Sequence, residues 1–285
     1  MIPRIVIRTF VSLAACAALG AAALPAGAQE TDVMTIMTRM KQALEPPRAM
    51  AAQLSFTVGA DQEKSTLTLG MARAKHTVAT RLLLVGLSPA DVRGTAYLIE
   101  DGSSDTASQW VYMPFIRRVR KIVAPEAFRA FLNSDFTYSD LGFVDLNAAY
   151  TLLGTETIDG NTAYRIQSVP KQQWYYGKIV TLVDGRTFLP IEREYYDLNG
   201  TLWKKERWEH ITVIDGAPTP VQITMQDVQG NTTSSITFTE IRYDADVPDS
   251  MITPDALPQA ANAPVWKTLD PKRGANGKAA AKQAK

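Results

Sequence analysis

The sequence predicts a mainly β protein built on one large antiparallel sheet. Two observations support this: short segments alternate apolar with polar residues, and turn-forming dipeptides separate them at the spacing of an antiparallel meander. The 285 residues are 46% hydrophobic and 21% charged, a composition typical of a folded protein long enough to bury a sizeable core. The turn dipeptides are Asp101-Gly102, Asp159-Gly160, Asp184-Gly185, Asn199-Gly200, Asp215-Gly216 and Gly230-Asn231.

Residues 1–28 have the layout of a secretory signal peptide. Arg4 and Arg8 precede an apolar run, and Ala26-Gly27-Ala28 matches the small-residue cleavage signal. We therefore expect the exported chain to begin at Gln29. The run is too short and too interrupted to predict a membrane span.

Cys16 is the single cysteine of the chain, which excludes an intramolecular disulfide framework and a Cys-based zinc site. It ends the segment Leu13-Ala14-Ala15-Cys16, which resembles a lipobox, so an alternative is lipid anchoring at Cys16. We favour cleavage after Ala28, because the apolar run continues past Cys16.

A helix is expected directly after the cleavage site. Thr31 or Asp32 can cap it, and Pro46-Pro47 end it after about Leu44. Its apolar residues recur at helical spacing, and one face carries three methionines, Met34, Met37 and Met40.

Strand patterns then dominate, and we expect roughly a dozen strands. In the last one, Ile236 and Phe238 share one face while Ile241 and Tyr243 fall on the other, so a bulge near Thr239–Glu240 would return all four to one side. Short helices are expected around Pro125–Leu132 and near Tyr138–Asn147. Residues 258–285, rich in Ala, Pro, Gly and Lys, are expected to form a disordered basic tail.

Such a sheet must cover its apolar face. It can form a sandwich, close into a barrel, or curl around the few available helices, and the pattern alone leaves these three open. A curled sheet that is incompletely filled would hold an apolar cavity.

A distinctive motif lies between residues 110 and 141. It reads Trp110-Val111-Tyr112-Met113-Pro114, then a basic strand, then Ser134-Asp135-Phe136-Thr137-Tyr138-Ser139-Asp140-Leu141. This pattern resembles the periplasmic outer-membrane lipoprotein-sorting proteins, relatives of the LolA and LolB carriers. The resemblance spans about residues 30–257, which we take as one domain between the signal peptide and the tail.

The resemblance implies an unclosed antiparallel half-barrel of roughly a dozen strands with a few lid or plug helices (the LolA-like fold). It implies a periplasmic carrier that binds a lipid or the acyl chains of a lipoprotein in an apolar cavity. The implied partners are lipid or lipidated protein, with an inner-membrane exporter or an outer-membrane acceptor. LolA is known for a gating arginine, and we assign no arginine of this sequence to that role.

Candidate residues for the cavity and lid come from the first helix and from the motif. Methionine adapts to varied apolar partners, so the methionine face suits a lid over lipid, with ordinary core packing as the alternative. The aromatic clusters Trp174-Tyr175-Tyr176 and Tyr195-Tyr196 could line a cavity mouth, but we favour cross-strand pairing for them. The cavity and lid candidates are Met34, Met37, Met40, Trp110, Tyr112, Phe136 and Tyr138.

The only dense basic run is a candidate docking patch for anionic lipid headgroups or an exporter. Its residues are Arg117, Arg118, Arg120 and Lys121. The favoured alternative is a solvated edge strand, in which charges prevent aggregation and Asp135 and Asp140 pair with the arginines.

We expect no catalysis, no cofactor and no metal. His76 and His210 lack a recognisable nucleophile partner, and no nucleotide-binding or hydrolase motif is present. With 30 Lys and Arg against 29 Asp and Glu, the balance argues against nucleic-acid binding. Two alternatives stay open: an envelope-stress sensor of the same fold, and a lipid hydrolase that uses Ser134 or Ser139.

Overall fold

The computed structural model describes residues 32–45, 49–59, 64–75, 79–102, 107–141 and 147–269. The expected signal peptide at residues 1–28, Cys16, His76 and the segment 270–285 lie outside the described residues. No helix within these ranges combines the length and the apolar composition needed to cross a membrane.

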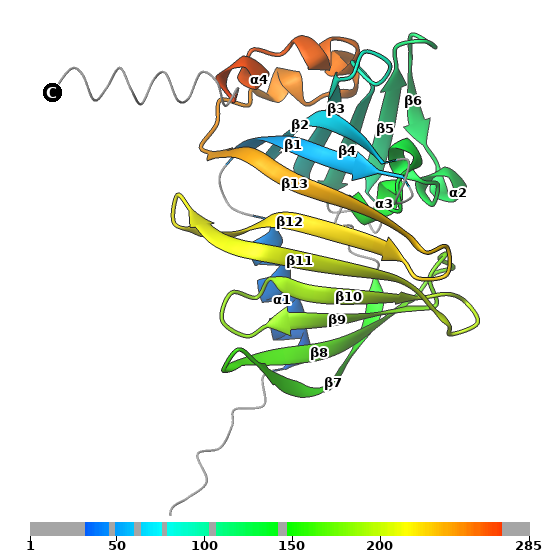
Figure 1. Cartoon of the computed structure of the whole chain (residues 1–285), viewed down its shortest axis with the longest axis vertical. Helices are drawn as coiled ribbons and strands as arrows, with labels where there is room; N and C mark the ends of the chain where they lie inside the picture. The colour runs from blue at the N-terminus through cyan, green and yellow to red at the C-terminus, as the bar shows by residue number, and fades with distance from the viewer. Residues whose placement is uncertain are drawn as a thin grey trace, which may run out of the picture. The chain divides into compact units, whose positions relative to one another are not determined.

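The described residues form one antiparallel sheet of 13 strands, in the order β6-β5-β4-β3-β2-β1-β13-β12-β11-β10-β9-β8-β7 (Figure 1). Two consecutive meanders, β1 to β6 and β7 to β13, join where β1 pairs with β13. Strands β6 and β7 end the sheet without pairing with each other, so it does not close into a barrel. This confirms the mainly β, unclosed half-barrel. The bounds are β1 (Met50–Val58), β2 (Ser65–Lys75), β3 (Ala79–Ser88), β4 (Ala96–Gly102), β5 (Ser108–Met113), β6 (Arg118–Ile122), β7 (Ala148–Ile158), β8 (Asn161–Pro170), β9 (Lys178–Asp184), β10 (Pro190–Tyr196), β11 (Leu202–Ile214), β12 (Ala217–Asp227) and β13 (Thr232–Tyr243).

A bulge in β13 keeps its apolar residues on one face, as predicted. Gln53 pairs with Glu240 and Leu54 pairs with Phe238, so Thr239 is the extra residue. The four apolar side chains at 236, 238, 241 and 243 consequently all pack against the same cluster. We call the side of the sheet that carries this cluster the inner face.

Helices cover the inner face. The first, α1 (Val33–Leu44), begins at Asp32, whose side chain accepts a hydrogen bond from the Thr35 amide at 3.3 Å. It packs Ile36 and Met40 toward β7 to β9, and Figure 1 shows it behind the lower strands. Three short pieces lie further along this face: α2 (Ala124–Ala127), η1 (Phe131–Asn133) and α3 (Tyr138–Leu141).

The outer face of β1 to β4 is also buried, because a C-terminal segment covers it. This segment comprises η2 (Asp249–Met251), η3 (Pro254–Asn262) and α4 (Val265–Thr268). Its side chains pack on Ala72, Leu83 and Leu98 of the strands. Continuous burial along β3 and β4 follows from this double cover.

The C-terminal segment corrects the expected boundary of the tail at residue 258. Residues 258–269 are not a disordered tail: Ala260, Val265, Trp266 and Leu269 are buried. The indole Nε1 of Trp266 donates a hydrogen bond to the Ala260 carbonyl at 2.7 Å. The composition is rich in Ala and Pro, but four apolar side chains suffice to bind the segment to an apolar sheet face.

Candidate ligand-binding cavity

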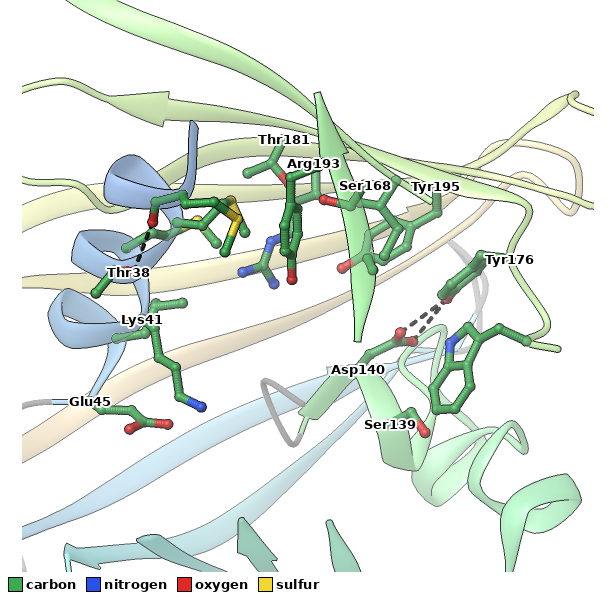
Figure 2. Close-up of a pocket in the computed structure, with 18 of the residues that line it drawn as sticks. Thr38, Lys41, Glu45, Ser139, Asp140, Ser168, Tyr176, Thr181, Arg193 and Tyr195 are labelled. Carbon is green, nitrogen blue, oxygen red and sulfur yellow. Dashed lines mark hydrogen bonds between the residues drawn. The ribbon is translucent and has the colours of Figure 1, made fainter. Parts of the chain in front are cut away.

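A cavity of about 220 Å³ lies between α1 and the inner face of β7 to β10 (Figure 2). Helix α1 forms one wall, the strands form another, and α3 with the β8–β9 loop closes the end. Four apolar side chains of α1 face the cavity, together with Lys41 and Glu45 toward the C-terminal end of the helix. Hydroxyl groups and Arg193 line the sheet wall. The lining residues are Met34, Met37, Thr38, Met40, Lys41, Leu44, Glu45, Ser139, Asp140, Ala148, Tyr150, Ser168, Trp174, Tyr175, Tyr176, Ile179, Thr181, Arg193 and Tyr195.

The three methionines predicted on one face of α1 all line this cavity. Met40 is buried, Met37 is half-buried, and Met34 is 53% exposed at the N-terminal end of the helix. They form an apolar track from the rim to the interior. Their flexible thioether side chains can repack around ligands of different shape.

Arg193 of β10 is the charged group on the sheet wall. Its Nη1 donates to Oε2 of Glu206 at 3.3 Å, and its guanidinium lies 5.4 Å from the ring centre of Trp208. Figure 2 shows the guanidinium directed into the cavity. A guanidinium carries five N–H donors, so this one can bind further acceptors.

The carboxyl group of Glu206 is the ion-pair partner of Arg193. Its Oε2 also accepts from the Tyr195 hydroxyl at 2.8 Å. Burial raises the pKa of the Glu206 carboxyl, and the nearby Arg193 cation opposes that increase. Burial likewise raises the pKa of the Tyr195 hydroxyl well above its usual value, so Tyr195 is a neutral donor.

Asp140 anchors the closed end of the cavity. It accepts hydrogen bonds from the hydroxyls of Tyr175 at 2.8 Å and Tyr176 at 3.0 Å, and from the Thr137 amide at 2.7 Å (Figure 2 draws the Tyr176 bonds). Its carboxylate lies 3.8 Å from the Nζ atom of Lys204. Burial raises the pKa of both tyrosine hydroxyls well above 10, which keeps them protonated.

The Ser134–Leu141 motif fastens this end to the sheet. Asp135 accepts a hydrogen bond from the Ser234 hydroxyl of β13 at 2.6 Å, and its own backbone carbonyl accepts one from Lys204 of β11 at 2.6 Å. The expectation that Asp135 and Asp140 pair with the basic run is therefore wrong. Both carboxylates bind inner-face partners instead.

Four aromatic residues that we placed at the cavity lie elsewhere. Trp110 and Tyr112 of β5 pack on the outer cluster, because their positions alternate with the inward Val111. Phe136 and Tyr138 belong to the inner core: Phe136 lies 6.0 Å from Phe56 and Tyr138 lies 5.0 Å from Tyr97, centre to centre. None of the four lines this cavity.

Other aromatic residues take that role. Trp174, Tyr175 and Tyr176, for which we favoured cross-strand pairing, lie in the loop between β8 and β9 and line the cavity. Tyr195 lines it as well, while Tyr196 hydrogen-bonds to Glu194 at 2.9 Å outside it. The unbroken aromatic triplet was the available signal, since alternation would send its middle residue away from the other two.

The basic run lies at the free edge of the sheet. Arg118, Arg120 and Lys121 belong to β6, and Arg117 belongs to the turn before it. Arg120 pairs with Glu126, and Lys121 lies over the Trp110 ring at 5.6 Å. The edge-strand position is as expected.

The residues considered for catalysis have structural surroundings. The Ser134 hydroxyl donates to the Phe131 carbonyl at 2.6 Å. The buried Ser139 hydroxyl has no hydrogen-bond partner within the described residues. His210 lies exposed in β11 with a positive φ of 55°. Across the described ranges, no group of three His, Cys, Asp or Glu side chains is placed to hold a metal ion.

A comparison with models of protein families shows the family to which the chain belongs. A family model described as an uncharacterized protein matches residues 79–259, more than half of the chain. The chain belongs to this family. No curated protein matches it.

Three solved structures have a fold similar to that of this chain. A lipoprotein-sorting protein domain from Vibrio parahaemolyticus superposes with a TM-score of 0.73 at 21% identity, over 78% of this chain and 97% of that one. A DUF1329 family protein from Desulfovibrio piger superposes with a TM-score of 0.72 at 26% identity, over 78% of this chain and 96% of that one. A LolA superfamily protein from Nitrosomonas europaea superposes with a TM-score of 0.62 at 21% identity, over 78% of this chain and 98% of that one. The family member therefore has the LolA-like fold of lipoprotein-sorting proteins.

Proposed function

We propose that the protein is a periplasmic carrier that binds an acyl chain of a lipid or lipidated protein in the cavity under α1. The observation that carries this proposal is the pairing of an apolar methionine track on α1 with a polar opposite wall. An acyl chain fits the first and its headgroup fits the second. One of the similar structures is a lipoprotein-sorting protein domain and another belongs to the LolA superfamily, which supports the same function.

The size of the cavity limits the cargo. Small-molecule pockets usually enclose about 300–1,000 Å³, and this one encloses about 220 Å³. With α1 in place it would take part of a single acyl chain, and a larger cargo would require α1 to move away. Each methylene buried contributes about 0.8 kcal/mol, so even a short inserted segment binds appreciably.

The polar wall favours an amphiphile over a plain hydrocarbon. Arg193, Thr181 and Ser168 present donors beside the apolar track. A buried donor left without an acceptor costs about 1–3 kcal/mol, so a headgroup with oxygen acceptors would be preferred.

Transfer across the envelope is part of the same proposal. The predicted signal peptide would deliver the chain to the periplasm, where an inner-membrane exporter or an outer-membrane acceptor would exchange cargo with it. No chemical step is required, because release needs only a partner or membrane that stabilises the open position of α1.

The first experiment is native mass spectrometry of the protein purified from a periplasmic extract, followed by organic extraction of what it holds. We expect a stoichiometric lipid or acylated peptide. A ligand-free mass that persists after mixing with envelope lipids would contradict the carrier and favour a sensor that acts through its surface.

The matched variant is Met37→Asp, which places a carboxylate on the apolar track. Because Met37 is half-buried, we expect retained lipid to fall about tenfold or more while the free energy of unfolding changes by under about 1 kcal/mol. The control is Thr35→Asp, which adds the same charge to α1 at an exposed position outside the cavity. Equal loss of lipid in both variants, or loss of folding that matches loss of lipid, would refute the lid role.

A further inference from the structure

The turn between β5 and β6 holds two large apolar side chains in solvent. Phe115 is 83% exposed and Ile116 is 51% exposed. They are adjacent in sequence, at the tip of a hairpin on the free edge of the sheet. Single exposed apolar residues are common, but an aromatic and an aliphatic side chain together at a hairpin tip form a contact surface.

The cations of the basic run surround this tip. Arg117 and Arg118 follow it directly and are exposed, and the sequence contains no acidic residue from 106 to 125. Among the described residues, no carboxylate lies within ion-pair distance of Arg117 or Arg118. Glu126, the first acid after the run, is occupied by Arg120. The tip therefore joins exposed apolar surface to net positive charge.

The backbone of the turn is fixed. The amides of Ile116 and Arg117 donate to the Met113 carbonyl at 3.1 and 3.0 Å. Pro114 packs on the neighbouring β3–β4 turn, where a Cβ added to Gly94 would lie 3.1 Å from its ring. Since the turn is already ordered, docking its side chains costs little backbone entropy.

We propose that this turn docks the protein on an anionic lipid surface, with Phe115 and Ile116 inserted among the lipids and Arg117 and Arg118 at the phosphates. An aromatic ring and an aliphatic chain suit the interfacial zone, and basic side chains beside them add attraction to anionic headgroups. Charge complementarity favours an anionic surface, and a bilayer presents acyl chains for the apolar pair directly beside phosphates for the cations. The docking needs no ligand in the cavity.

The test is flotation of the purified protein with vesicles of phosphatidylethanolamine and phosphatidylglycerol, compared with vesicles of phosphatidylcholine alone. We expect binding to the anionic vesicles that weakens with added salt. Phe115→Ser should lower the partition coefficient about tenfold or more. Arg117→Gln and Arg118→Gln should each lower it roughly fivefold on anionic vesicles only.

Leu198→Ser is the matched control, since Leu198 is 69% exposed in the β10–β11 turn beside Asp197 rather than beside cations. Its vesicle binding should equal that of the unmodified protein. Lipid occupancy in native mass spectrometry should stay unchanged in Phe115→Ser, which separates this inference from the cavity. Absence of binding to anionic vesicles, or equal binding by Phe115→Ser, would overturn the proposal and leave a protein partner as the occupant of the turn.

Discussion

Asp140 is the residue on which the closed end of the cavity depends. It is almost fully buried, it accepts from two tyrosine hydroxyls and one amide, and it faces the buried Lys204 ammonium. A buried pair of this kind adds little net stability, but losing one member leaves the other charge uncompensated. Its role is to hold α3 and the β8–β9 loop at fixed positions.

Asp140→Leu should therefore cost about 3–5 kcal/mol of unfolding free energy, because it leaves the buried Lys204 ammonium without its carboxylate and the Tyr176 hydroxyl without its acceptor. Adding Lys204→Met should recover part of that loss. Urea unfolding of both single variants and the double variant gives the coupling energy. Strictly additive losses would show that the two groups do not interact.

At the scale of residues, the orientation of a side chain could be predicted where it follows from the periodicity of its own element. It could not be predicted where it depends on residues of a neighbouring strand. The methionine face of α1 follows from helical spacing alone. Arg193 lies among Glu192 and Glu194 and resembles a solvated strand residue in sequence. Its partners Glu206 and Trp208 lie on the neighbouring strand and stabilise an inward cation, and that pairing is not visible in the sequence. The available signal was its position two residues before Tyr195, which places both side chains on the same face of β10.

At the scale of elements, the C-terminal segment is the part that the sequence misrepresents. The bulge at Thr239 could be predicted, because a strand with two apolar faces demands it. The segment 254–269 could not, because its few apolar residues become meaningful only against the outer face of β1 to β4. That face was not expected to be apolar and covered, and Trp110 and Tyr112 were misplaced for the same reason.

The close approach of Trp266 to Gly70 gives a test of this packing. A Cβ at Gly70 would lie 2.8–2.9 Å from ring carbons of Trp266. Gly70→Ala should thus destabilise the protein by about 1–3 kcal/mol through overpacking, and Trp266→Ala by about 3–5 kcal/mol through lost burial.

The distinguishing measurement is Gly70→Ala in the Trp266→Ala background, where thermal or urea unfolding should show little further loss, since the ring that clashes is gone. If Gly70→Ala costs the same in both backgrounds, the segment does not rest on β2 as described.

At the scale of the whole sheet, α1 connects the two meanders across the inner face. Its residues Ile36 and Met40 pack on the β7 to β9 side, and Arg39 between them lies 4.9 Å from the Phe188 ring centre. Its C-terminal end is held by the other meander: Arg73 of β2 donates to the Leu44 carbonyl and lies 3.5 Å from Glu45, and Lys41 lies 3.6 Å from Asp101. Moving α1 off the cavity therefore means breaking its contacts with β2 and β4.

Arg73→Met tests whether those contacts limit release. Methionine keeps the apolar stem but removes every donor, and a hydrogen bond from a charged group is worth about 1.5–3 kcal/mol. If α1 must detach for cargo to leave, the open state becomes more populated by that amount, and release should accelerate about tenfold or more. Transfer of a fluorescent fatty acid from the protein to acceptor vesicles measures the rate.

The control for this variant is Arg81→Met, which removes the 2.6 Å pair between Arg81 and Glu100 on β3 and β4 without touching α1. It should leave the release rate unchanged. A release rate in Arg73→Met equal to that of the control would mean that cargo leaves through the open rim at Met34 while α1 stays in place. The protein would then exchange cargo by threading a single chain, and the cavity volume of about 220 Å³ would set the upper limit on what it carries.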